Sequence, residues 1–573
     1  MIQKALAFLL LIYLTACSPP GLTAAPSQPA ATAKPAATAS ATFHPPTATA
    51  APTTLPIATS TPSAGSLTWW NDAVFYEIFV RSFYDSNGDG VGDFNGLIEK
   101  LDYLNDGDPV TTSDLGVNAL WLMPIHPSPS THGYDVTDYY AVNPQYGSLE
   151  DFRRLVAEAH RRGMHVIIDM VLNHTSSQHP WFFQSQDPAS PYRNWYVWAD
   201  KDPGFKGPWN QQVWYPLDGG YFYAYFWEGM PDLNYANPAV TAEMQKAARF
   251  WLADVGIDGF RLDAIGALIE NGAETVETRD THDWLRGYFS FVKSLRPDAV
   301  TVGEVWREDS VVIPYVRQDE VDLAFEFDLS AALLASINEG SSANVLDALR
   351  SGTLQFPAGQ YGTSLTNHDM ARVMTQLGGD GQKAKAAASL YFALPGVPFI
   401  YYGEEIGLSG EAPDEMGRRP MQWNGGVFAG FSSAAPWKAP DIDPVHNVAA
   451  QLANPDSLLA HYRGWIAQRL SHPALRTGEL NLFSTSDPGV FACLRTTSAE
   501  AVLVVVNLTG AGLRGLRLSL DSSPLEAGEY AAVSLWDGTK QAAMTVLEGG
   551  KIAGYEPLAE LPPYATLLIQ LQP

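Results

Sequence analysis

The stretch GIDGFRLDA, residues 256–264, joins a predicted helix to a predicted strand whose end is charged. Residues 238–255 before it carry apolar side chains at the 3.6-residue period of a helix. These side chains are Val240, Met244, Ala247, Ala248 and Trp251. In the strand that follows, Arg261 and Asp263 are two residues apart, so their side chains point to the same side. A helix that leads into a short strand is typical of an α/β fold.

Seven further runs rich in β-branched and aromatic residues alternate with helix-like segments along the chain. The eight runs are 74–80, 117–123, 165–172, 256–262, 299–305, 321–327, 361–366 and 397–403. One helix is expected to begin with a capping box at Ser148 to Asp151 and to stop at Gly163. This alternation predicts a (β/α)₈ barrel, the TIM barrel, although the pattern alone also permits a doubly wound sheet.

Two parts of the chain depart from this alternation. Roughly 65 residues separate the third strand from the next helix, far more than an ordinary connection needs. We therefore predict an inserted domain over 173–236, which leaves 67–172 and 237–474 for the barrel. Residues 475–573 hold strand-like runs separated by turn residues, and they predict a C-terminal β-sandwich.

The composition limits the kinds of molecule that the protein can bind. Lys and Arg number 35 against 62 Asp and Glu, which gives a net charge of −27. Such a charge repels a phosphate backbone, so we expect no nucleic-acid partner. The 16 Trp, 25 Tyr and 25 Phe suit stacking against sugar rings, and equally a large aromatic core.

The N-terminus predicts export. MIQKALAFLLLIYLTAC has one early charge and an apolar run shorter than a membrane span needs. Its end, Leu14 to Cys17, resembles a bacterial lipobox; an ordinary signal peptide is the alternative. The resemblance implies cleavage of residues 1–17 before Cys17, lipidation of Cys17, and an extracytoplasmic protein held to the bacterial cell membrane only by that lipid.

The segment after Cys17 predicts a tether. Residues 18–66 are rich in Pro, Ala, Thr and Ser and cannot form a core, so we expect a disordered linker. Cys493 is the remaining cysteine, expected in a strand of the core without a disulfide.

Charged residues stand at the ends of several predicted strands, where barrels place their functional groups. Asp169 and His174 end the third run, Arg261 and Asp263 the fourth. Further along, Glu304 follows the fifth run, and His368 and Asp369 follow the seventh. A lone Asp at such a position most often caps a turn, but four charged strand ends in order favour one chemical site.

Six segments carry a family resemblance: HGYDVTDYY (132–140), DMVLNH (169–174), MPDLN (230–234), GFRLDA (259–264), GEVW (303–306) and TNHD (366–369). Together they resemble the α-amylase family, glycoside hydrolase family 13. The resemblance spans about residues 69–475. It implies a (β/α)₈ domain, an inserted domain B after strand 3, a β-sandwich domain C, and cleavage of α-glucosidic bonds with retained configuration.

The resemblance also implies roles for single residues. Asp263 would be the nucleophile and Glu304 the general acid and base, with a pKa that carboxylate neighbours and desolvation raise. Asp369 would be the third catalytic carboxylate, gripping the sugar hydroxyls. Arg261 would keep Asp263 ionised, supported from behind by Asp169. The expected substrate contacts are His132, Tyr134, His174, Arg261, His368 and Arg418, with His174 and His368 donating hydrogen bonds to the reacting ring.

Three local features bear on the substrate. The resemblance implies α-1,4 action, because Ala264 stands where relatives acting on short α-1,6-linked sugars tend to carry Val, and because MPDLN resembles the intermediate subgroup between α-amylases and oligo-1,6-glucosidases. In contrast, RRPMQW (418–423) resembles a segment of oligo-1,6-glucosidases. We expect a monomeric α-amylase-like enzyme that cleaves internal bonds of starch and maltodextrins. Exo-acting α-glucosidase and oligo-1,6-glucosidase are the near alternatives, and a non-catalytic starch-binding lipoprotein is the remote one.

Calcium is expected at the loop DSNGDGVGDFNG, residues 85–96. Its acidic spacing is that of an EF-hand, but Gly96 stands where a bidentate Glu is needed, and no flanking helix pair fits. Similar loops in oligo-1,6-glucosidase-like relatives imply a structural Ca²⁺; a solvated acidic turn is the alternative. The implied ligands are the side chains of Asp85, Asn87, Asp89 and Asp93 and the carbonyl of Val91. A second, interdomain calcium is in doubt, because residues 264–267 lack the usual Lys-His pair, although Asn173 resembles one of its ligands.

Overall fold

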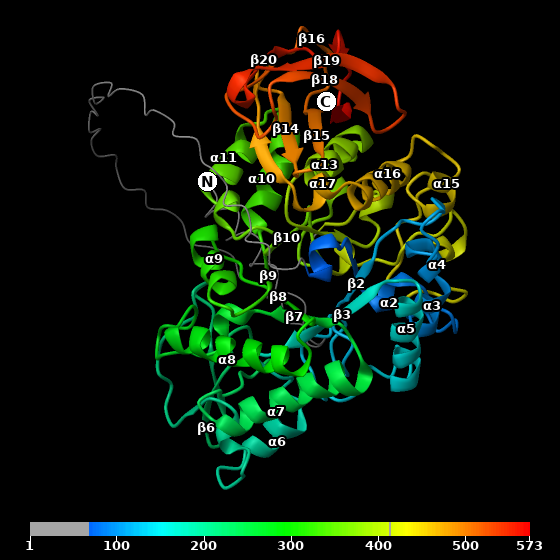
Figure 1. The fold of residues 1–573 in the computed structure, drawn as a ribbon. Helices are drawn as coiled ribbons and strands as arrows, with labels where there is room; N and C mark the ends of the chain where they lie inside the picture. The colour runs from blue at the N-terminus through cyan, green and yellow to red at the C-terminus, as the bar shows by residue number, and fades with distance from the viewer. Residues whose placement is uncertain (1–67, 412–413) are drawn as a thin grey trace, which may run out of the picture. The chain divides into compact units, whose positions relative to one another are not determined.

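The protein's structure, a computed structural model, describes residues 68–411 and 414–573 (Figure 1). The predicted signal peptide, Cys17 and the predicted linker lie outside the described residues. Within those residues, no helix is both long enough and apolar enough to span a bilayer.

The predicted eight-stranded barrel is confirmed. Parallel strands pair in the order β1-β11-β10-β9-β8-β7-β3-β2, and pairing of β2 with β1 closes the ring. A doubly wound sheet is thereby excluded. The strands are β1 Phe75–Ile78, β2 Ala119–Leu122, β3 His165–Val171, β7 Gly259–Asp263, β8 Val300–Gly303, β9 Leu323–Phe325, β10 Tyr361–Thr363 and β11 Val397–Tyr401. Each overlaps its predicted run, and inward-facing aromatic rings such as Phe75 and Phe399, stacked at 4.3 Å, fill the barrel.

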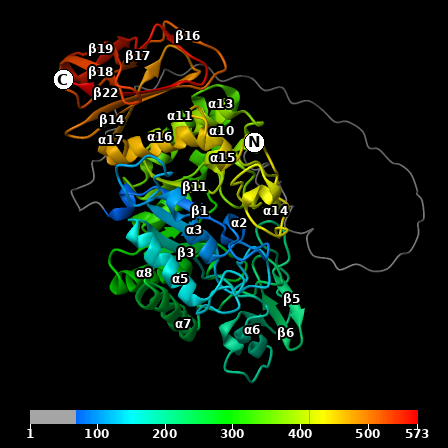
Figure 2. The same ribbon diagram turned by 90° about the vertical axis from the view of Figure 1, so that its right-hand side faces the viewer.

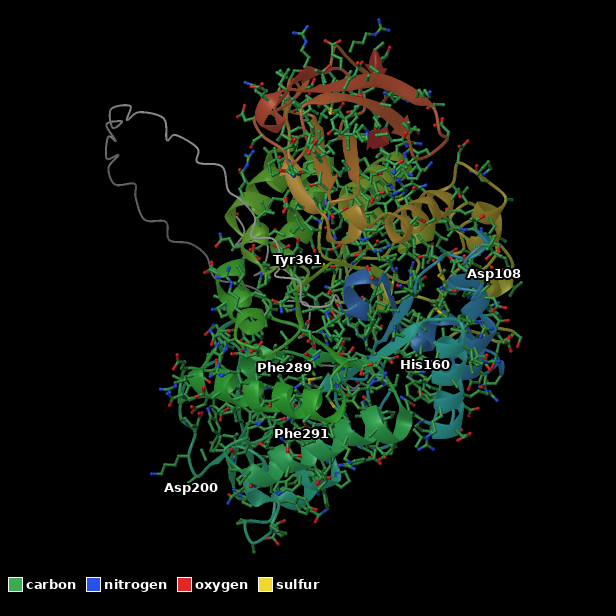
Figure 3. The ribbon with its side chains drawn as sticks, viewed as in Figure 1. Asp108, His160, Asp200, Phe289, Phe291 and Tyr361 are labelled. Atoms are coloured by element: carbon green, nitrogen blue, oxygen red, sulfur yellow. The ribbon has the colours of Figure 1, made fainter. Side chains whose placement is uncertain are left out.

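Helix α5, Leu149–Arg161, begins at the predicted capping box. The Ser148 hydroxyl accepts a hydrogen bond from the Asp151 amide at 3.1 Å, and the Asp151 carboxylate accepts one from the Ser148 amide at 2.9 Å. At its other end, His160 (labelled in Figure 3) lies 2.7 Å from Asp258, next to β7. Local capping and this distant contact fix the helix against the barrel.

Helix α7, Pro238–Arg249, confirms the periodicity that precedes GIDGFRLDA. It continues into one π-helical turn, Phe250–Val255, and all five of the apolar residues predicted for its inner face are buried. Gly256 then adopts a left-handed conformation with φ of +93°, which only glycine adopts without strain. The chain therefore leaves the helix there and enters β7.

Further helices surround the barrel or connect its strands. Figure 2 labels one of them, α8, and Figure 3 labels its residues Phe289 and Phe291. They are α2 Val80–Phe83, α3 Phe94–Glu99, α4 Leu101–Leu104, α8 Arg279–Leu295, α9 Asp309–Arg317, α10 Phe327–Glu339, α11 Ala343–Ser351, α12 Val373–Gln376, α13 Gly381–Ala393, α14 Asp414–Gly417, α15 Val448–Leu452, α16 Leu458–Ser471 and α17 Pro473–Thr477.

The long connection between β3 and α7 forms structure of its own. It contains α6, Pro180–Ser185, and a small antiparallel sheet in the order β4-β6-β5. Its strands are β4 Trp198–Ala199, β5 Trp214–Leu217 and β6 Gly220–Tyr223. A β-bridge between His174 and Asp232 ties the start of the connection to its end. In Figures 1 and 2 these elements lie beside α7.

The predicted C-terminal sandwich is confirmed. A six-stranded antiparallel sheet, β12-β14-β15-β22-β18-β19, shares one hydrophobic cluster with strands of two smaller sheets, β13-β17-β20 and β16-β21. The strands are β12 Glu479–Leu482, β13 Ser484–Thr485, β14 Val490–Thr496, β15 Ala501–Asn507, β16 Leu513–Arg514, β17 Leu518–Leu520, β18 Gly528–Ser534, β19 Lys540–Val546, β20 Ile552–Tyr555, β21 Glu560–Leu561 and β22 Thr566–Gln572.

The central strands of this sandwich are buried on both faces. Alternate residues of β15, such as Leu503 and Val505, join the sandwich cluster, while Val502 and Val504 join the large core shared with the barrel. Cys493 in β14 is buried as predicted, and burial raises the pKa of its thiol to about 12. Cys493 is therefore an inert core residue.

Candidate active site

The predicted strand-end residues meet at one end of the barrel. Asp169 lies in β3, Arg261 and Asp263 end β7, and Glu304 directly follows β8. All parallel strands of a barrel present their carboxyl ends on one face, so residues far apart in sequence converge there.

Arg261 is the centre of the cluster. Its Nη1 lies 2.5 Å from Oδ1 of Asp169 and 2.7 Å from Oδ1 of Asp263, and its Nη2 lies 2.8 Å from Oε1 of Glu304. The guanidinium is 1% exposed. One buried cation thus holds three carboxyl groups, and its planar fork fixes their relative directions.

Asp263 and Glu304 form a close pair. The Ala264 amide, next to Asp263, donates to Oε2 of Glu304 at 3.0 Å. Burial raises the pKa of Asp263 to about 8; the Arg261 charge opposes the rise, and the charges of Glu304 and Asp169 add to it. Arg261 therefore favours the ionised form of Asp263, as expected, but burial and the neighbouring carboxylates outweigh its effect.

Aromatic and histidine rings line the adjoining surface. The Tyr134 hydroxyl lies 2.7 Å from Nε2 of His368, and the two rings stack at 5.5 Å. His132 stacks on Tyr134 at 6.1 Å, and burial lowers the pKa of His132 to about 3. Burial alone would also lower the pKa of His368, but the charges of Asp369 and Glu77 raise it to about 10. The site thus combines a neutral imidazole, His132, with an imidazolium, His368.

His174 faces the site with one nitrogen unused. Its Nδ1 donates to Oδ1 of Asn173 at 3.0 Å, and burial lowers its pKa to about 3. Its Nε2 is buried and has no hydrogen-bond partner among the described residues. The predicted hydrogen bond from His174 to the reacting sugar ring stays a prediction.

Asp369 is oriented from behind. Nη2 of Arg418 lies 2.8 Å from Oδ1 of Asp369, and Nε of Arg418 donates to the carbonyl of His368 at 3.0 Å. Burial disfavours the charged form of Asp369, but His368 and Arg418 hold its pKa below the usual value. The structure thus places Arg418 against Asp369, and its predicted contact with substrate stays a prediction.

Three residues of the site were missed in the sequence. Nε1 of Trp306 donates to Oε1 of Glu304 at 2.7 Å, and Nε1 of Trp121 donates to Oδ2 of Asp169 at 2.9 Å. Glu77 in β1 contacts Nδ1 of His368 at 2.5 Å. A carboxylate inside the apolar run 74–80 was the signal for Glu77, whereas Trp121 looks like any core residue of a strand.

In the acidic loop after β1, the carboxylates accept hydrogen bonds from other groups of the protein. Oδ1 of Asp85 accepts hydrogen bonds from the amides of Asn87 and Gly88, and Oδ2 accepts from the Gly90 amide and the Ser432 hydroxyl. Asp93 caps α3 through the Gly96 amide at 2.7 Å.

The remaining predicted ligands stay within the same network. Oδ1 of Asn87 accepts from the Asp89 amide at 2.9 Å, and Oδ1 of Asp89 accepts from the Val91 amide at 2.8 Å. No three His, Cys, Asp or Glu side chains of the described segments are grouped so that they could hold a metal ion. Asp85, Asp89 and Asp93 thus do not form such a group, and calcium binding stays a prediction.

Asn173, which resembles a ligand of the interdomain calcium, makes hydrogen bonds within the protein. Its amide donates to Oδ2 of Asp232 at 3.0 Å and to the carbonyl of Ala267 at 2.5 Å. Burial raises the pKa of Asp232 well above its usual value. Hydrogen bonds therefore join the inserted segment to the loop after β7 at this point.

Comparison with known proteins agrees with this geometry. The family model described as "Alpha amylase, catalytic domain" matches residues 77–478. Alpha-amylase 3 of Dictyoglomus thermophilum is 40% identical over 450 residues, which cover 77% of this chain and 85% of that protein. A trehalose synthase of Thermus thermophilus is 36% identical over 513 residues, which cover 77% of this chain and 50% of that protein.

A solved structure extends the similarity to nearly the whole described chain. The crystal structure of an alpha-amylase from H. orenii aligns with a TM-score of 0.75 at 40% identity. The alignment covers 87% of this chain and 99% of that one. The barrel, the insertion and the terminal sandwich therefore occur together in a related protein.

Proposed function

The chain belongs to the alpha-amylase family of glycoside hydrolases, and within it we propose an enzyme that cleaves internal α-1,4 bonds of starch and maltodextrins. The observation that carries the proposal is the pair Asp263 and Glu304 on one guanidinium. Retaining glycosidases hold their two carboxyl groups roughly 5–5.5 Å apart, whereas inverting enzymes need a wider gap for water. Contact of Glu304 with both Arg261 and the Ala264 amide favours the close arrangement.

In the first step, Asp263 attacks the anomeric carbon as Glu304 gives its proton to the glycosidic oxygen. The bond from that carbon to the leaving sugar breaks, and a covalent glycosyl ester forms on Asp263. Arg261 stabilises the Asp263 carboxylate, and the Trp306 indole orients Glu304.

In the second step, the Glu304 carboxylate takes a proton from water while the water oxygen attacks the anomeric carbon. The ester to Asp263 breaks, so two inversions retain the configuration. Asp369, fixed by Arg418, and the imidazolium of His368 would bind hydroxyl groups of the reacting ring. These contacts would favour the distorted ring of the transition state.

Two relatives bear on the substrate. The 40% identity to an alpha-amylase and Ala264 after the nucleophile support α-1,4 cleavage. The trehalose synthase similarity supports a second candidate, in which a sugar hydroxyl replaces water in the second step. The RRPMQW segment, 418–423, supports a third candidate, an oligo-1,6-glucosidase, in which water completes the second step.

A product profile separates these candidates. The purified protein would be incubated with starch, maltotetraose, isomaltose, pullulan and maltose, and its products resolved by chromatography. We expect iodine staining of starch to fall before glucose accumulates, with isomaltose untouched. Trehalose from maltose would favour the synthase, glucose alone an α-glucosidase, and no turnover on any substrate a binding protein.

We also propose that Cys17 carries a lipid that holds the enzyme to the outside of the bacterial membrane. The support is the lipobox-like sequence ending at Cys17. In a bacterial host, Cys17→Ser should move the enzyme from the membrane fraction to the medium or periplasm. Equal membrane association of both proteins would contradict the anchor.

A further inference from the structure

The insertion between β3 and α7 exposes an aromatic side chain that the core does not need. Trp209 is 42% exposed, and the half-buried Phe226 lies beside it, with ring centres 6.4 Å apart and an angle of 34° between the planes. Large exposed aromatic rings that are not packed into a core often mark binding surfaces. The pair is called the Trp209 ridge below.

The ridge leads to the candidate active site. The Phe226 ring meets the His174 ring at 5.3 Å in an edge-on contact. His174 in turn presents the buried Nε2 that has no partner among the described residues. A row of rings thus runs from the exposed indole through Phe226 to His174, which closely follows the carboxyl end of β3.

The backbone holds Trp209 in place. Its amide donates to Oε1 of Gln211 at 3.0 Å, and Nε2 of Gln211 donates to the Tyr225 carbonyl at 3.1 Å. The next residue, Asn210, has a φ of +64°, a conformation that costs a non-glycine residue free energy. These contacts fix the backbone of the turn that carries the exposed ring.

A second exposed aromatic ring lies at the candidate active site. Trp306 is 39% exposed, stacks on Phe327 at 3.8 Å and donates to Glu304. On the insertion, the Tyr225 ring contacts Trp209 at 5.2 Å. Trp306 is therefore a second exposed aromatic ring, and it contacts a carboxyl group of the candidate active site.

We propose that the Trp209 ridge is a stacking platform for glucose units of an α-glucan chain that lie outside the ring cleaved at Asp263. Sugar rings present faces of C–H groups, which pack on aromatic rings without any need for charge. Binding there would favour long chains over short ones. The identity of the sugar rests on the proposed function, whereas the existence of the platform does not require turnover.

Kinetics with substrates of two lengths test the platform. For Trp209→Ala we expect kcat/KM on amylose to fall about tenfold, as is typical when one stacking ring is lost, with less than a twofold change on maltotriose. Trp209→Phe should recover most of the loss. Phe183→Ala is the matched control, because Phe183 is 71% exposed on α6 in the same insertion.

Binding tests the platform without turnover. In the Glu304→Gln background, calorimetry with maltoheptaose should show weaker binding when Trp209→Ala is added, and unchanged binding when Phe183→Ala is added. Equal losses on both substrate lengths, no loss on amylose, or the same loss from Phe183→Ala would overturn the platform. If the native enzyme cleaves neither substrate, the proposed function fails, and calorimetry alone decides the platform.

Discussion

Two acidic regions of this protein place similar carboxyl groups in different surroundings. In the loop 85–96, Asp85 and Asp93 are buried and accept hydrogen bonds from backbone amides and serine hydroxyls. At the strand ends, Asp263 and Glu304 are buried as well, but they share the Arg261 guanidinium and lie beside further carboxylates. Burial is similar in both regions, and the partners differ.

The difference separates a structural use of carboxylates from a chemical one. Neutral amides fix the direction of a carboxylate and cap a helix. A shared cation and close carboxylates instead couple the protonation of the groups, so that a proton can be held and released. Four predictions test this contrast, from the largest expected effect to the smallest.

Removing either member of the proposed reacting pair, Asp263 and Glu304, should have the largest effect. We expect Asp263→Asn and Glu304→Gln each to lower starch hydrolysis by about 10³-fold or more, since each removes a nucleophile or a proton donor. Melting temperature should change little, because both substitutions keep the size of the side chain. Asp93→Asn, which preserves a good helix cap, is the control and should retain activity. Near-normal hydrolysis by either active-site variant would refute the assigned roles.

Removing the shared cation should cost stability and activity together. Arg261→Met leaves Asp169, Asp263 and Glu304 buried without their partner, and losing one member of such a cluster typically costs about 3–5 kcal/mol. The cost should shrink at pH 5 relative to pH 8, because protonation removes the unpaired charges. Urea titrations of the native protein and of Arg261→Met at pH 5 and pH 8 measure the free energy of unfolding. A loss of stability that is equal at both pH values would show that the three carboxyl groups do not need the Arg261 charge.

The His368 network predicts a pH dependence of smaller size. Its folded-state pKa of about 10 lies above the usual 6.5, so the protonated form is stabilised by folding. This stabilisation is complete below about pH 6.5 and is lost as the pH rises toward 10. Glu77→Gln removes one of the carboxylates that raise this pKa, so the free energy of unfolding should fall less steeply between pH 7 and 10. Identical pH dependence in the native protein and the variant would show that Glu77 does not raise the pKa of His368.

The acidic loop should give the smallest effect. If it binds Ca²⁺, Asp89→Ala should lower the melting temperature and its response to calcium, while turnover at low temperature stays the same. Asp89 accepts a single hydrogen bond, from the Val91 amide, so the contact itself contributes only about 1 kcal/mol. A melting temperature unaffected by chelator in the native enzyme would leave the loop as a hydrogen-bonded turn without a metal.

Elements that depend on near neighbours were predictable. The Ser148 capping box, the inner face of α7 and the eight strand runs all follow from residues a few positions apart. The strand-end residues Asp263, Glu304 and Asp369 were identifiable because barrel strands carry functional groups at one end. Trp121 and Glu77 were not identifiable as site residues. A Trp or a single Glu in an apolar strand has no neighbouring sequence feature that distinguishes a core residue from a site residue.

The sequence by itself determined the order of strands and helices and set Arg261 and Asp263 on one side of their strand, because the two-residue period of a strand is local. Only the tertiary structure decided which groups those side chains meet. Closure of the barrel brings Glu77 of β1 to His368, 291 positions away, and Glu304 to Arg261. Burial and those distant charges then set the protonation of each carboxyl group, since desolvation and Coulomb interactions depend on distance in space.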